Sequence, residues 1–137
     1  GRMAIVLPQG RFNNASDKYI RDFIAERCRI LAVVGLHGNV FKPHTGTKTS
    51  VLFVQKWDDK LCPKKDDYPI FFATMREPSK DNSGDKIYRM NSDGSHMLDM
   101  NDHLIVKHDL YNHDGLTEDG IAEAFIEFAK KEHLSFF

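Results

Sequence analysis

Hydrophobic positions in the first part of the chain change from one period to another. Residues 3–8 form a continuous apolar run that ends at a proline, which is typical of a strand buried on both faces of a parallel sheet. Residues 17–29 then repeat apolar side chains at helical spacing, with Ser16 as the expected N-cap and Asp17 in the first turn. A second apolar run covers residues 30–34. This order predicts a β-α-β unit.

The next connection is too short to contain another crossover helix. It runs from Gly38 to Thr49, with Pro43 and Gly46 inside it, and a third apolar run follows at residues 50–57. Because a parallel return needs a crossover of a dozen or more residues, usually a helix, we expect the third strand to lie antiparallel to the second.

The middle of the chain is more polar. A polar break at residues 58–67 precedes a fourth β-prone run at residues 68–75. Residues 78–115 are then rich in Asp, Asn, Ser, Gly and His, with only brief apolar pieces. This composition predicts a surface extension with one short hairpin, and no internal repeat is evident in it.

An amphipathic helix is expected to close the chain over residues 118–132, capped by Thr117. Its narrow apolar stripe favours packing on its own sheet, and contact with another protein is the alternative. We divide the chain into residues 1–76, the sheet-bearing part, and residues 77–137, the polar extension and closing helix.

Composition narrows the class of protein only modestly. The chain of 137 residues is 41% hydrophobic and 28% charged, as is ordinary for a soluble domain. No apolar run reaches the roughly 20 residues that span a bilayer, and no signal segment is evident. Two cysteines form neither a disulfide framework nor a paired metal motif, which favours a reducing, cytoplasmic compartment. With a net charge of −1, binding to DNA would need locally gathered Lys and Arg.

Familiar catalytic motifs are missing from the sequence. It has no glycine-rich dinucleotide loop, no Walker loop, no serine elbow and no zinc helix. Four histidines gather in the polar extension, but their spacing is irregular and no cysteine accompanies them. We therefore interpret them as polar surface residues, with a metal-dependent nuclease as a weaker hypothesis; they are His96, His103, His108 and His113.

The segment from Gly38 to Thr49 carries the most suggestive side chains. It offers an aromatic ring at Phe41 and a basic group at Lys48, followed by the hydroxyl of Thr49. Basic and hydroxyl groups hold phosphates, and an aromatic face can stack on an unpaired base. A second interpretation stays open, in which Phe41 plugs the end of the sheet.

Three blocks of the sequence resemble those of N6-adenine DNA methyltransferases, the modification subunits of type I restriction-modification systems. Residues 1–10 are similar to the family's strand "gly-gly-arg-ala-ala-ile-val-leu-pro-x-gly". Residues 19–29 are similar to "ile-arg-x-x-leu-x-glu-x-cys-x", and residues 40–53 to "val-phe-x-pro-tyr-thr-gly-val-lys-thr-ser-ile-leu-phe". The blocks come in the family's order and spacing and cover residues 1–57 well.

This resemblance implies an α/β fold, the C-terminal half of a Rossmann-like seven-stranded sheet that is parallel except for one strand. Residues 3–8 would be its fifth strand and residues 30–36 its sixth. Residues 50–57 would be the antiparallel seventh strand, inserted between those two. The apolar start and the Phe-Phe end of the chain suggest that both ends are cuts in a larger protein.

The resemblance also implies a function for the whole protein, which is methyl transfer from S-adenosylmethionine to adenine N6 in double-stranded DNA. The family's cofactor loop and catalytic asparagine-proline-proline-aromatic motif do not occur here and would lie upstream. No catalytic, cofactor-binding or metal-binding residue is therefore assigned, and the fragment alone should be inactive. By motif position Phe41 would pack on the extruded base, and Lys48 and Thr49 would contact the DNA backbone.

The family's partners are a specificity subunit and a restriction subunit. The alternative is that this chain is a module that contacts one of those subunits and has no catalytic residues of its own. No membrane association is expected.

Overall fold

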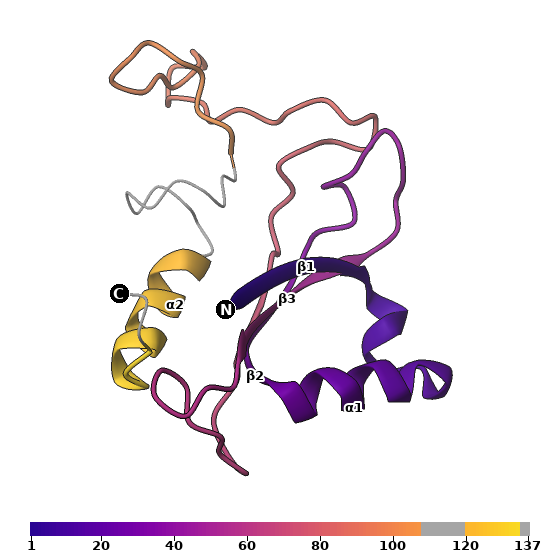
Figure 1. Ribbon diagram of the computed structural model, residues 1–137. Helices are drawn as coiled ribbons and strands as arrows, with labels where there is room; N and C mark the ends of the chain where they lie inside the picture. The colour runs from indigo at the N-terminus through magenta and orange to yellow at the C-terminus, as the bar shows by residue number, and fades with distance from the viewer. Residues whose placement is uncertain (108–119, 135–137) are drawn as a thin grey trace.

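The computed structural model describes residues 1–107 and 120–134. Its centre is a four-stranded sheet in the order β1-β3-β2-β4 (Figure 1). The strands are β1 (Arg2–Pro8), β2 (Cys28–Gly35), β3 (Thr49–Lys56) and β4 (Phe71–Thr74). The helices are α1 (Lys18–Arg27) and α2 (Ile121–Lys131), and two short 3-10 helices, η1 (Gln9–Phe12) and η2 (Ala15–Asp17), follow β1. The chain is thus of mixed α/β class.

The strand directions agree with the sequence-based prediction. β3 pairs antiparallel with both β1 and β2 and lies between them, so β1 and β2 run parallel to one another. The short fourth strand, β4, adds to the far side of β2 in parallel. The prediction of an inserted antiparallel strand is therefore confirmed. The described residues form four strands, so they do not show the full seven-stranded sheet.

The two helices lie on opposite sides of the sheet (Figure 1). Because successive strand residues point to opposite faces, Leu52 and its alternate neighbours face α1, whereas Phe53 and its alternates face α2. On the α2 side, the ring of Phe71 lies 5.5 Å from that of Phe125 and 5.6 Å from that of Phe128, measured between centroids. Phe125 and Phe128 also pack against a core cluster formed by Leu31, Ala129 and Leu134. The α2 stripe thus packs on its own sheet.

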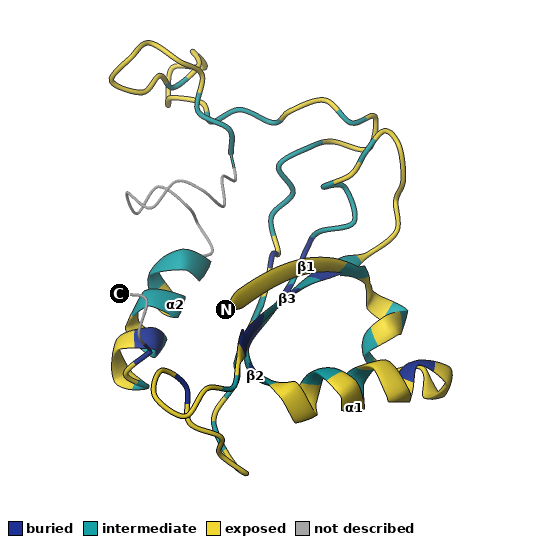
Figure 2. Cartoon of the chain, viewed as in Figure 1, coloured by how far each residue is buried: buried dark blue, intermediate teal, exposed yellow. Residues whose placement is uncertain are grey.

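Burial is uneven across the sheet (Figure 2). Residues of β2 and β3 are largely buried, whereas β1 is exposed along most of its length, including Ile5 and Val6. The prediction that this apolar run is buried on both faces is wrong for the described residues. Apolar character brings the run into the sheet, but β1 is the edge strand, and its side chains border the open hollows on the two faces of the sheet, so neither face is fully covered.

The start of α1 also differs from the prediction. Ser16 lies within η2, and Asp17 is the residue at the N-cap, without a side-chain capping hydrogen bond. Its carboxylate accepts instead from the guanidinium of Arg11. The prediction of Ser16 as the N-cap, which was based on its place just before the helical pattern, is therefore wrong. At the other end of the chain, the predicted cap Thr117 lies outside the described residues, and Gly120 precedes α2.

The polar extension contains three turns of one design instead of one hairpin. The first residue of each turn donates its N–H to the carbonyl four residues on and accepts from the N–H three residues on, at 2.8–3.2 Å. The third residue after it has a positive φ, which completes a type I turn followed by a left-handed residue. The turns run over residues 81–85, 91–95 and 99–103. The absence of an internal repeat was therefore a wrong expectation.

Candidate functional site

The carboxyl ends of three parallel strands meet at one edge of the sheet. β1 ends at Pro8, β2 at Gly35 and β4 at Thr74, and β3 begins beside them at Thr49. In open α/β sheets, ligands bind in the crevice outside this edge. This edge of the sheet is therefore where a functional site is expected in this chain.

A polar hollow of about 350 Å³ lies at this edge. It is contributed by residues just past the ends of β1, β2 and β4 and by the start of β3. Two larger hollows of about 510 and 500 Å³ lie over the two faces of the sheet, but apolar side chains dominate their linings. The smaller hollow has the least apolar lining of the three, and its side chains able to hydrogen bond are Gln9, His37, Lys48, Thr49, Ser50 and Thr74.

The loop between β2 and β3, residues 36–48, is built from successive turns. The carbonyl of Phe41 accepts from the N–H groups of His44 and Thr45, at 3.0 and 3.1 Å. At the base, the N–H of Leu36 donates to the carbonyl of Thr49 at 2.9 Å, while the carbonyl of Lys48 accepts from the N–H of Gln9 at 3.1 Å. The loop is thus tied to the ends of β1, β2 and β3 through its main chain.

The three residues proposed from the sequence occupy different places around the hollow. Phe41 lies in the loop beyond the lining and is 37% exposed. Lys48 is exposed and lines the hollow. Thr49 lines it as well, but its hydroxyl is enclosed and has no hydrogen-bond partner within residues 1–107 and 120–134. The structure brings Lys48 and Thr49 together and places Phe41 to one side.

His37 is a member of the hollow that sequence reasoning did not identify. Its Nδ1 accepts the N–H of Asn39 at 3.1 Å. An imidazole nitrogen that accepts carries no proton, so the neutral ring carries its proton on Nε2, a donor able to meet an acceptor. Its position just after the carboxyl end of a strand was the available signal, and the same holds for Gln9.

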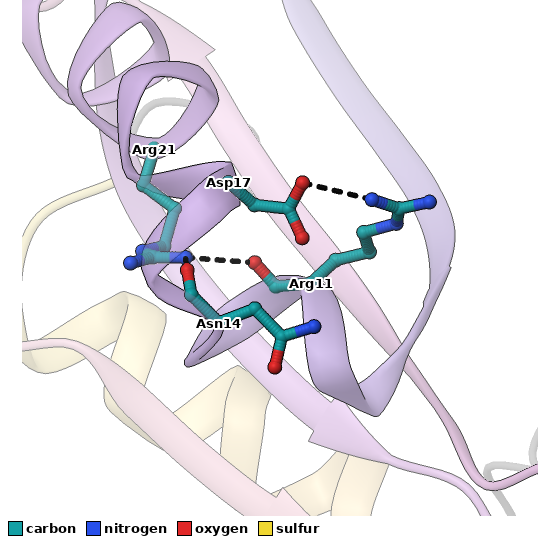
Figure 3. Close-up of polar contacts among 4 residues, drawn as sticks. All are labelled: Arg11, Asn14, Asp17 and Arg21. Atoms are coloured by element: carbon teal, nitrogen blue, oxygen red, sulfur yellow. Dashed lines mark hydrogen bonds and ion pairs between the residues drawn. The ribbon is translucent and has the colours of Figure 1, made fainter.

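A network of polar contacts supports the turn that presents Gln9 (Figure 3). Arg11 Nη1 lies 2.8 Å from Asp17 Oδ1. Arg21 Nη1 donates to the carbonyls of Arg11 and Asn14, at 3.1 and 2.8 Å. These contacts join the first turns of α1 to the segment after β1. They fix the path of the main chain where it leaves the sheet at the hollow.

The histidines of the extension do not converge with other ligands among the described residues. His96 packs edge-on against Tyr88, with 5.9 Å between ring centroids. His103 Nδ1 lies 3.6 Å from a carboxylate oxygen of Asp99. In residues 1–107 and 120–134, no three His, Cys, Asp or Glu side chains are placed to hold a metal ion. The other two histidines of this group, His108 and His113, lie outside the described residues.

The fold and the site together define the class of protein. It is an α/β protein whose candidate site lies at the carboxyl edge of the sheet, below a long β2–β3 loop. Comparison with known protein families gives the particular one. The family described as N-6 DNA Methylase matches residues 1–124. This chain belongs to that family, and the resemblance seen in the sequence is confirmed.

Individual relatives match shorter stretches. The methylase subunit of the type I restriction enzyme EcoEI from Escherichia coli is 40% identical over 57 residues, which are 41% of this chain and 12% of that protein. A solved protein of Listeria monocytogenes, described as a class I S-adenosylmethionine-dependent methyltransferase, aligns with a TM-score of 0.45 and 21% identity. That alignment covers 55% of this chain and 22% of the solved one. This chain thus spans a small part of each relative.

Among the described residues, no helix is both long and apolar enough to cross a membrane.

Proposed function

We propose that this chain is the DNA-facing, C-terminal part of the catalytic domain of an adenine-N6 DNA methyltransferase from a type I restriction-modification system. The observation that carries the proposal is the β2–β3 loop, which presents an exposed Phe41 and, in the lining of the hollow at the carboxyl edge of the sheet, an exposed Lys48. Membership of the N-6 DNA Methylase family supports methyl transfer to adenine as the reaction of the whole protein. The geometry of the loop supports contact with DNA as the role of this chain.

In this proposal, β1, β2 and β3 are the fifth, sixth and seventh strands of a Rossmann-like seven-stranded sheet. Residues 1–76 complete that sheet, and residues 77–137 form the extension and closing helix. S-adenosylmethionine supplies the methyl group when bound, and the groups that hold it and the catalytic motif belong to the rest of the protein. This chain alone is therefore expected to be inactive.

The chemistry requires that the target adenine leave the duplex, because N6 is not accessible to a methyl donor inside the base stack. Leaving the stack exposes both faces of the base to water. An aromatic ring at the mouth of the site restores part of the lost stacking, which contributes about 1–3 kcal/mol per base. We assign this role to Phe41.

Lys48 is assigned a contact with the DNA backbone. Its exposed ammonium lies beside the hollow, and such a group neutralises a phosphate without selecting sequence. Thr49 is assigned a contact with the DNA backbone as well, from the base of the loop, where its carbonyl accepts from the N–H of Leu36 at 2.9 Å. A DNA specificity subunit and a restriction subunit complete the proposed assembly, which acts on double-stranded DNA in the cytoplasm.

Substitution of Phe41 tests the proposal. In the complete methyltransferase that carries this chain, Phe41→Ala should lower kcat/KM for DNA by about tenfold or more, while the thermal unfolding midpoint changes little. Phe23→Ala is the matched control, because Phe23 is more exposed and lies on α1 instead of the loop. Equal methylation rates for the Phe41 variant and the unmodified protein would exclude the assigned role.

A further inference from the structure

The first turn of the polar extension is fastened to the β2–β3 loop although the two are about 40 residues apart in sequence. The side-chain amide of Asn39 donates to the carbonyl of Lys80 at 3.0 Å and to Oδ1 of Asn82 at 3.2 Å. One residue of the loop therefore binds a main-chain acceptor directly before that turn and a side-chain acceptor within it.

A second contact runs in the opposite direction. The ammonium of Lys80 donates to the carbonyl of Lys42 at 3.0 Å in a part-buried position. Lys42 follows Phe41 in the loop, so this hydrogen bond holds the Lys42–Pro43 peptide, one residue beyond the aromatic side chain. A charged donor on a neutral carbonyl is among the stronger hydrogen bonds in proteins.

Close packing accompanies these hydrogen bonds. Gly84 has a φ of +97°, and a Cβ at that position would lie 2.7 Å from the nitrogen of Pro43. The turn and the loop thus touch main chain to main chain, which leaves no space for a side chain. The turn itself is held by Asp81, whose Oδ1 accepts from the N–H groups of Ser83 and Asp85, at 2.9 and 3.0 Å.

We propose that Lys80 and Asn39 are positioning residues that fasten the β2–β3 loop to the first turn of the extension and so fix where Phe41 is presented. The importance of this for catalysis rests on the proposed function of Phe41. The fastening itself does not, because it is a statement about the order of the loop. The extension is, on this account, a brace for the DNA-facing loop as well as a surface feature.

The test compares three lysine variants in the complete methyltransferase. Lys80→Met removes the ammonium and keeps most of the side-chain length, whereas Lys80→Arg keeps a charged donor. Lys86→Met is the matched control, since Lys86 is an exposed lysine that directly follows the same turn. Hydrogen exchange is measured at the amides of His44 and Thr45, which donate to the carbonyl of Phe41, together with kcat and KM for DNA.

Lys80→Met is expected to speed exchange at these two amides about tenfold, with partial recovery in Lys80→Arg and no change in Lys86→Met. Methylation should fall in the same order, mainly in kcat, because loss of alignment affects the step after binding. Unchanged exchange in a folded Lys80→Met protein would overturn the proposal. If Lys80→Met does not fold, hydrogen exchange at the same two amides is measured in Asn39→Asp. This variant removes both N–H donors of the Asn39 side-chain amide with little change of shape.

The two proposals fail separately. If Phe41→Ala leaves methylation unchanged while Lys80→Met still loosens the loop, the function of Phe41 is wrong and the brace stands. If Phe41→Ala lowers methylation but exchange at His44 and Thr45 is unchanged in the Lys80 and Asn39 variants, the brace is wrong and the function of Phe41 stands.

Discussion

Arg11 and Asp17 form an ion pair whose two members differ sharply in exposure. Nη1 of Arg11 lies 2.8 Å from Oδ1 of Asp17, and the arginine side chain is 56% exposed whereas the aspartate side chain is 6% exposed. The buried carboxylate thus depends on a partner that solvent reaches freely. This pair closes the segment between β1 and α1 (Figure 3), and both side chains line the hollow on the α1 face of the sheet.

Removal of the arginine should harm stability more than removal of both charges. Arg11→Ala leaves a buried carboxylate without its cation, and we expect a loss of about 1–2 kcal/mol, reduced from that of a fully buried pair because Arg11 is half exposed. The double variant Arg11→Ala/Asp17→Asn should lose less, since no buried charge remains. Chemical denaturation measures both losses. Lys18→Ala, at the exposed pair with Asp22, serves as control and should lose under about 0.5 kcal/mol. A double variant less stable than Arg11→Ala would contradict this account.

Two glycines of the extension should respond differently to the same substitution. Gly84 and Gly94 both have positive φ, at +97° and +86°, so alanine is conformationally strained at either position. Open space surrounds Gly94, and Gly94→Ala should lower the free energy of unfolding by about 1–2 kcal/mol. Gly84→Ala should lower it further, because the new Cβ would lie 2.7 Å from the nitrogen of Pro43. Similar denaturation midpoints for the two variants would mean that the turn does not rest on the loop.

The later turns of the extension should lose stability in acid, because their aspartates are stabilised in the ionised form. Hydrogen bonds from the Ser95 hydroxyl and N–H lower the pKa of Asp93, and those from the His103 and Asn101 N–H groups lower the pKa of Asp99, both from 3.8. A depressed carboxyl pKa stabilises the turn above the unfolded value, and that contribution disappears as pH falls through the folded value. Carboxyl NMR titration should therefore give midpoints below 3.8 for both groups. Ser95→Ala should raise the pKa of Asp93 alone, and a matching rise at Asp99 would show that the turns are not independent.

The closing helix offers a test of the alternative role as a subunit contact. Phe128 packs on Phe71 and on the Leu31 cluster, so Phe128→Ala should lower the free energy of unfolding by about 2–3 kcal/mol. Glu127→Ala, at an exposed position of the same helix, should have little effect on stability. If Phe128→Ala instead weakened association with the specificity or restriction subunit at unchanged stability, α2 would be an interface helix.

Periodicity and spacing were sufficient to predict strands β1, β2 and β3 and the direction of β3, but not their order in the sheet. The apolar runs and the short connection before Thr49 dictate an antiparallel β3, and the family resemblance placed it between β1 and β2. Periodicity and spacing could not predict features that depend on neighbouring elements of the fold. The exposure of β1 depends on what lies beside the strand, and the pairing of Arg11 with Asp17 displaces the local N-cap expected at Ser16.

The candidate site was predictable in part for a similar reason. Lys48 and Thr49 were identified from the loop's own residues, and both line the hollow. His37 and Gln9 join them only because β2 and β1 end at the same edge, which is a property of the sheet. The contact of Asn39 with Lys80 is a long-range pairing without a periodic signature. The sequence therefore revealed which residues of the loop could bind a ligand, but not which residues from other segments lie beside them in the fold.

The central claim is that Phe41 compensates an extruded adenine for its lost stacking, and the most direct measurement compares two DNA substrates. One is a normal duplex, and in the other the target adenine faces an abasic site and is already free to leave the helix, so extrusion is easier. Methylation by the complete enzyme is followed for the unmodified protein and for Phe41→Ala. The account predicts a loss of about tenfold or more on the normal duplex and a clearly smaller loss on the abasic one. Equal losses on both substrates, or none on either, would contradict it.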